Sequence, residues 1–287
     1  MSTATANIMM DSSTDARFRA WGSGISAQLA AFGWIYVADA GRIDWGTVLK
    51  PAAGSTKQGF EVYRFADALQ ATSPVFVRID YGSGSNAGDP SIWYTFGTAT
   101  DGAGNVVPGN LDIIRGLMTQ DANTRTAYFS GTTGRGVFCT GPAATAGVMV
   151  FSVERTKDAA GADTGDGLLI AHTIGNPTNA TQWRQQYYQL GVGSQGIENR
   201  LGILMPSAGS GVTGADTAIY PLWHPKGPFL PYGLNLFGYF TDDLVALNTY
   251  VLTVYLAAHT YLALGPTLGG CVTGATASKS TLLMRYE

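Results

Sequence analysis

The stretch GFEVYRFADALQATSPVFVRIDYGSGSNAGDPSIWYTFGT, residues 59–98, decides how the rest of the chain is interpreted. Three segments within it, residues 60–65, 76–81 and 91–98, are rich in aromatic and β-branched residues, which fit the pleated surface of a sheet. The segments between them contain Pro, Gly, Asp and Asn, the residues that favour turns. The pattern predicts three consecutive strands joined by loops.

Short apolar segments and turn signals continue through most of the chain. We predict further strands at residues 127–130, 136–140, 148–155, 167–173, 186–190, 201–205, 218–223, 234–240 and 282–286. The segment 148–155 is expected to pair with 167–173 across a polar loop. Many short strands with frequent turns are typical of antiparallel folds. The predicted fold class is mainly β, an antiparallel β-sandwich-like architecture with one N-terminal amphipathic helix.

That helix is predicted from apolar residues that recur at spacings of three and four and so line one face: Phe18, Trp21, Ile25 and Leu29. Ser12 or Ser13 is expected to cap its first turn, and Gly33 stands where it would end. Gly22 and Gly24 weaken it by about 1 kcal/mol each relative to Ala, so packing must hold it. The apolar face either docks to a neighbouring subunit or covers the chain's own sheet.

The chain divides into an N-terminal arm and helix, residues 1–35, and a β-rich body, residues 36–287. A soft boundary within the body is expected near residues 101–125, where a short helix is predicted around residues 111–118. Neither this stretch nor any other has the composition of a clear linker, which favours one compact β unit.

The mostly apolar segment 244–264 is long enough to span a bilayer. It contains several polar residues, and no Lys or Arg flanks it closely, so a membrane span is not expected. We predict instead a short helix over residues 242–247 and a hairpin with strands at 251–257 and 260–264.

Charged residues are scarce: 17 Lys and Arg and 20 Asp and Glu make 13% of the 287 residues, about half the usual share. The net charge of −3 offers few cations to a phosphate backbone, which argues against nucleic acid as a partner. A surface of Thr, Ser, Ala, Gly and Asn is easily packed against, so we expect a homo-oligomer, a trimer or a ring. The alternative is a soluble protein with a polar, uncharged surface.

No sequence motif indicates an enzyme, a cofactor or a zinc site. The three histidines, His172, His224 and His259, occur in none of the patterns typical of metal or nucleophilic centres. Calcium prefers carboxylates on a flexible loop, and Asp158, Asp163 and Asp166 lie in one acidic segment. A solvated hairpin tip explains the same segment equally well.

Aromatic residues next to amides can stack against sugars, and they also dominate cores and interfaces. The candidates for a glycan-binding surface are Trp183, Tyr187, Tyr188 and Trp223. Core or interface packing remains the alternative interpretation for all four.

Three segments of the first part of the chain, FRAWGSGISAQLAAFGW (18–34), VADAGRIDW (37–45) and the stretch 59–106, together resemble a group of tailed-bacteriophage proteins. The resemblance covers roughly the first 110 residues. It implies a virion structural protein from the tail, baseplate or tail-fibre region, assembled in the host cytoplasm with other virion proteins. It implies no catalytic residues. The alternative expectation is a receptor- or glycan-binding protein on the virion surface that recognises a host surface glycan.

Overall fold

The computed structural model describes residues 2–107, 114–117, 120, 123–140, 148–158, 160–174, 183–189, 193–198, 219–221, 236–240, 248–254, 257–263 and 280–287. The first half contains β1 (Ser2–Met9), α1 (Asp15–Ala31), β2 (Ile35–Val37), β3 (Lys57–Arg64), the 3-10 helix η1 (Ala68–Ala71), β4 (Phe76–Ser83), β5 (Pro90–Gly97), β6 (Ala99–Thr100), β7 (Val106–Val107), β8 (Ile114–Leu117), β9 (Thr124–Thr132) and β10 (Arg135–Thr140). The second half contains β11 (Val148–Lys157), β12 (Asp163–Ile174), β13 (Trp183–Gln189), β14 (Gly193–Glu198), β15 (Ile219–Pro221), β16 (Leu236–Phe240), β17 (Asn248–Val254), β18 (Ala257–Ala263) and β19 (Ser280–Arg285).

The strands form three main antiparallel sheets. The seven-stranded sheet has the order β1-β9-β10-β11-β12-β13-β14, the N-terminal five-stranded sheet β2-β3-β4-β5-β8, and the C-terminal five-stranded sheet β15-β16-β19-β18-β17. The predicted class, mainly β with antiparallel sandwich-like architecture and one N-terminal helix, is confirmed. The predicted pairing of β11 with β12 is confirmed as well.

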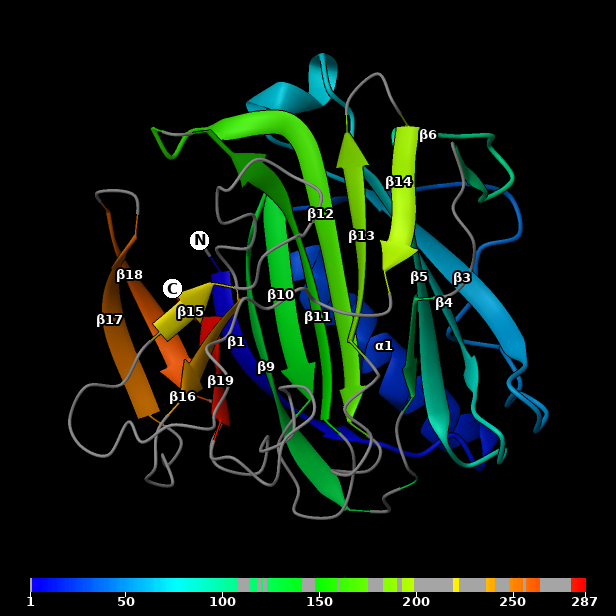
Figure 1. Ribbon diagram of the computed structural model, residues 1–287. Helices are drawn as coiled ribbons and strands as arrows, with labels where there is room; N and C mark the ends of the chain where they lie inside the picture. Colours follow the sequence, from blue (N-terminus) through cyan, green and yellow to red (C-terminus); the bar gives the residue numbers. More distant parts are fainter. Residues whose placement is uncertain are drawn as a thin grey trace.

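The seven-stranded sheet lies in the centre of the molecule (Figure 1). On one face, an aromatic row of Phe129, Phe138 and Phe151 crosses β9, β10 and β11. Tyr94 of β5 stacks on Phe151 with 4.5 Å between ring centroids, which joins the N-terminal sheet to this face. On the other face, Tyr286 and Glu287, just after β19, meet Tyr128 and Ser130 of β9. The described elements therefore form three layers.

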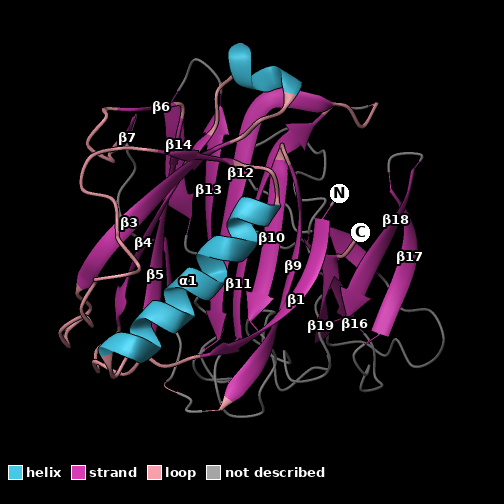
Figure 2. Cartoon of the chain, turned by 180° about the vertical axis from the view of Figure 1, so that it is seen from behind, coloured by secondary structure: helices cyan, strands magenta, loops and turns pink. Residues whose placement is uncertain are grey.

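The helix α1 runs obliquely across the molecule beside β1 (Figure 2). Its N-cap is Thr14, whose Oγ1 accepts a hydrogen bond from the Arg17 amide, so the prediction of Ser12 or Ser13 was wrong. The reason is tertiary: the Ser12 hydroxyl donates to the Ala87 carbonyl at 2.6 Å, and the Ser13 amide donates to Asp11. Gly33 follows the helix with φ +85°, a left-handed conformation that suits glycine.

A short helix was expected around residues 111–118, but residues 114–117 form strand β8. Here β8 extends the N-terminal sheet by pairing with β5, and ladder hydrogen bonds outweigh the local preference of so short a segment.

The hairpin predicted with strands at 251–257 and 260–264 is present as β17 and β18, which pair antiparallel and each begin three residues earlier than predicted. Within the part of the chain that the structure describes, no helix is long and apolar enough to cross a membrane. The strand predicted at 201–205 and the helix predicted at 242–247 lie outside the described residues.

Candidate functional site: a groove on the N-terminal sheet

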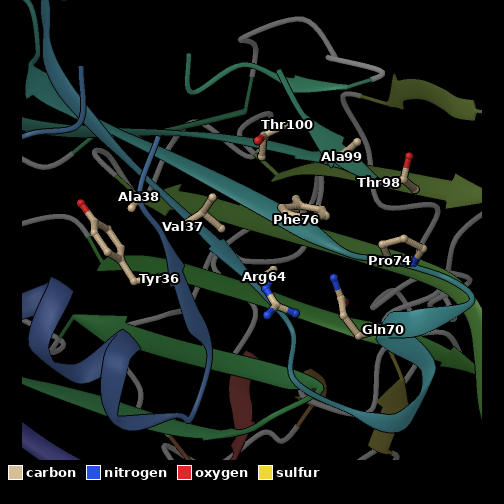
Figure 3. A pocket seen from close by; sticks show the side chains of 10 residues that line it. All are labelled: Tyr36, Val37, Ala38, Arg64, Gln70, Pro74, Phe76, Thr98, Ala99 and Thr100. Atoms are coloured by element: carbon tan, nitrogen blue, oxygen red, sulfur yellow. The ribbon is translucent and has the colours of Figure 1, made fainter. Parts of the chain in front are cut away.

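An open groove of about 720 Å³ lies on the outer face of the N-terminal sheet, the face directed away from the seven-stranded sheet. Segments from five elements meet there (Figure 3). The lining residues are Tyr36, Val37, Ala38, Arg64, Gln70, Pro74, Phe76, Thr98, Ala99 and Thr100. The groove thus combines the aromatic ring of Phe76 with a cation, an amide and two hydroxyls, whereas the ring of Tyr36 packs against Tyr63 on the other face of the sheet.

Strand pairing sets the floor of the groove. Arg64 of β3 is the register partner of Ile35 on β2 and of Phe76 on β4, so these three side chains share one face of the sheet. Arg64 and Phe76 are half-buried, and Ile35 is 40% exposed beside them. Among the residues that the structure describes, no carboxylate pairs with the Arg64 guanidinium. The groove therefore offers an uncompensated positive charge next to an aromatic ring.

A buried ion pair fixes the wall that carries Gln70. Arg155 of β11 is 1% exposed, and its Nε and Nη2 atoms donate to both carboxylate oxygens of Asp67 at 2.5 and 2.8 Å. Its Nη1 donates to the Ser73 carbonyl at 2.9 Å, so one guanidinium holds both ends of η1. The Gln70 Oε1 atom accepts a hydrogen bond from the Val75 amide, and this bond leaves the amide nitrogen of Gln70 available to a ligand.

The opposite wall is held by Asp39, which is 7% exposed. Its carboxylate accepts hydrogen bonds from the Gly104 amide at 3.0 Å and from the Thr100 hydroxyl at 3.3 Å. These bonds tie the β6–β7 hairpin to the segment after β2. Both walls of the groove are thus anchored by buried or half-buried acidic side chains, and the site is built before any ligand arrives.

A second polar cluster lies inside the core and positions α1. Glu61 of β3 is 3% exposed and accepts four hydrogen bonds. Ser26 and Trp45 donate to Oε1 at 2.7 and 3.1 Å, and Tyr81 and Tyr63 donate to Oε2 at 2.8 and 3.1 Å. Burial, followed by the charge of Glu61, raises the pKa of both tyrosines well above the usual range. They stay protonated and donate, so this cluster is structural.

A third cluster joins the C-terminal sheet to the outer face of the seven-stranded sheet. Arg135 and Glu154 are buried there with Arg285 and Tyr261. Burial, together with the nearby Arg285, lowers the pKa of Arg135 to about 10. His259 Nδ1 lies 2.8 Å from Glu287 Oε1, which also receives Arg285 Nε. The His259 ring is therefore paired with the Glu287 carboxylate within this cluster.

The four helix residues predicted for subunit docking, Phe18, Trp21, Ile25 and Leu29, are all completely buried within the chain itself. Trp21 packs edge-on against Tyr81 of β4, and Phe18 lies against Trp45. This is the covering role, the second of the two alternatives. The docking role has no exposed side chain among these four.

The four aromatic residues predicted to stack against a glycan are not among the side chains that the structure describes. Trp183, Tyr187 and Tyr188 lie on β13, of whose side chains the structure gives no description, and Trp223 lies outside the described residues. The aromatic ring of Phe76, which lines the groove, was not singled out from the sequence. The sequence signal was weak, because Phe76 stands in an ordinary strand pattern and only the pairing of β3 with β4 brings it beside Arg64.

The acidic segment between β11 and β12 forms a turn. Asp158 Oδ1 accepts hydrogen bonds from the amides of Ala160 and Ala162, both at 2.9 Å, and Asp163 pairs with Lys157. Across the described residues, no group of three or more His, Cys, Asp and Glu side chains is placed to hold a metal ion. Asp158 and Asp163 are thus engaged within the turn, and the side chain of Asp166, on β12, lies outside the described ones.

Comparison of the chain with protein-family models, with curated proteins and with solved structures finds no match.

Proposed function

We propose that this chain is a structural component of a bacteriophage particle, in the tail, baseplate or tail-fibre assembly, and that it acts by packing against other virion proteins and copies of itself. The resemblance of residues 18–34, 37–45 and 59–106 to tailed-phage proteins supports the particle assignment. The low share of charged residues supports the packing role.

The structural observation that carries the packing role is the edge of the seven-stranded sheet. Strand β1 pairs with β9 over eight residues without a bulge, and no strand among the described residues pairs with its other side. Natural edge strands are normally protected from further pairing by charges, Pro or bulges. Residues 2–10, STATANIMM, contain neither a charge nor a Pro, and Thr3, Thr5 and Asn7 are exposed. Such an edge suits pairing with a second copy of the chain.

The particle assignment is tested on purified virions of the phage that encodes the chain. Quantitative mass spectrometry is expected to find the chain in a fixed number of copies per particle. Its absence from particles that are otherwise complete and infectious would overturn the assignment.

The groove favours a second candidate function, binding of a glycan on the host surface. Sugar sites combine flat aromatic faces, which pack against the C–H face of a pyranose, with a few fixed polar side chains. Phe76 supplies an aromatic ring, and Arg64, Gln70 and the two threonines supply the polar groups. Measurable binding of any sugar that is lost on Phe76→Ala would support this function, and the absence of sugar binding would exclude it.

A further inference from the structure

We infer that the groove on the N-terminal sheet binds an acidic sugar, a monosaccharide unit that carries a carboxylate, and that Arg64 holds this carboxylate. The inference rests on the second candidate function, glycan binding, and is independent of the packing role. It specifies the chemical class of the ligand and the residue that selects it.

The charge inventory of the groove carries the inference. Arg64 is the cation among the lining residues, and none of the ten is acidic. The acids that hold the two walls of the groove are already engaged: Asp67 accepts from Nε and Nη2 of Arg155, and Asp39 accepts from Gly104 and Thr100. Arg78, on the same face of the sheet, is neutralised by Asp80 at 2.6 Å. Within the described residues, the positive charge of Arg64 thus has no acidic partner and can pair with an anionic ligand in the groove.

The geometry favours a carboxylate. A guanidinium presents two parallel N–H donors that match the two oxygens of a carboxylate, and the pair is stronger when partly desolvated. Arg64 is half-buried against the sheet, and Figure 3 shows it beside Gln70, with Phe76 across from both. The Gln70 amide nitrogen can donate to a ring hydroxyl while Oε1 stays bonded to Val75.

The groove also fits a ring of that kind. Phe76 adjoins Arg64 in the strand register, so a sugar whose carboxylate meets Arg64 lays its apolar face on Phe76. The Thr98 and Thr100 hydroxyls are bonded to the Val107 carbonyl and to Asp39, and each oxygen can still accept from a sugar hydroxyl. A small anion such as phosphate would pair with Arg64 but would not contact the Phe76 ring or the two threonine hydroxyls.

The test uses glucuronate, galacturonate and N-acetylneuraminate as probes, each paired with its methyl ester, which keeps the ring and removes the charge. Saturation-transfer NMR titrations of the full chain measure each dissociation constant. We expect at least one acid to bind about tenfold more tightly than its ester, because a charge-assisted bidentate pair is lost in the ester. Added inorganic phosphate is expected to compete weakly.

Two variants complete the test. Arg64→Gln should abolish the tenfold preference for the acid over its ester. Arg64→Lys should keep only part of this preference, since lysine lacks the two parallel N–H donors of a guanidinium. Lys50→Gln, which removes an exposed cation near Ser13, is the control and should leave the preference unchanged. Thermal unfolding checks that each variant is folded.

Each outcome decides between the proposals. Equal binding of acids and esters overturns the acidic-sugar inference and leaves glycan binding standing. Binding of neither excludes both. A preference for the acid that survives in folded Arg64→Gln overturns the assignment of Arg64.

Discussion

At the scale of single residues, the buried Glu61 carboxylate accepts four hydrogen bonds, two on each oxygen. Replacing it with Gln puts an amide NH₂ against hydroxyl and indole donors and leaves some of them unsatisfied in the core. We expect Glu61→Gln to lower the free energy of unfolding by about 1–3 kcal/mol, measured by urea titration.

The control for this variant is Asp163→Asn. Asp163 pairs with Lys157 on an exposed turn, and such surface pairs contribute about 1 kcal/mol or less. Equal losses in the two variants would show that the Glu61 cluster does not stabilise the core.

The residues differ in how far the sequence could predict them. The buried face of α1 was predicted residue by residue, since a helical period is local information. The groove was not, because Arg64 and Phe76 become neighbours only through the register of β3 and β4. Arg155 stands in a strand pattern, and no nearby sequence feature predicts its hydrogen bonds to Asp67, 88 residues away.

At the scale of elements, α1 contains two glycines with opposite surroundings. A Cβ on Gly22 would lie 1.8 Å from the Trp45 ring, whereas a Cβ on Gly24 would lie 3.7 Å from Ile8. We expect Gly22→Ala to destabilise the protein by about 1–3 kcal/mol through overpacking, despite its better helix propensity. Gly24→Ala has the same propensity gain with room for the methyl group, and it should stabilise by up to about 1 kcal/mol.

The two alanine variants are compared by thermal unfolding under identical conditions. A gain in stability from both would mean that Trp45 does not lie against α1 at Gly22. The sequence indicated only that packing must hold this helix, and the structure shows the Trp45 indole packed closely against it at Gly22.

Other elements were predicted less well for the same physical reason. The N-terminal strand β1 was expected only as an arm, because STATANIM has little of the apolar alternation that marks a strand. Its partner β9 supplies the order, over a register that runs from Ser2 opposite Gly131 to Met9 opposite Thr124. For β8 as well, pairing with a neighbour overrides what the segment prefers alone.

At the scale of the whole molecule, the contact between the C-terminal sheet and the seven-stranded sheet should depend on pH. Burial and the charge of Arg285 lower the pKa of His259, against the opposing effect of Glu287. Burial would raise the pKa of Glu287, but Arg285 and His259 outweigh it and lower this pKa. Both groups therefore bind fewer protons in the folded state than in the unfolded state under acidic conditions.

Unfolding therefore takes up protons, and the free energy of unfolding falls as the pH drops. For His259 the loss begins near its ordinary pKa of about 6.5 and continues below it. Urea titrations at pH 8, 7, 6 and 5 are expected to show this decline, and His259→Asn should flatten the part between pH 7 and 5. A stability of the wild type that stays constant from pH 8 to 5 would contradict the prediction.

The central claim is that copies of this chain pack together through the open edge of β1, and the mass in solution tests it most directly. Multi-angle light scattering of the purified protein is expected to give an oligomer. Thr5→Lys, which places a charge in the middle of the exposed edge, should shift it to the monomer. Thr124→Lys, on the adjoining strand β9 and also exposed, should leave the oligomer intact. A wild-type protein that stays monomeric at every concentration, or an oligomer unaffected by Thr5→Lys, would contradict packing through β1.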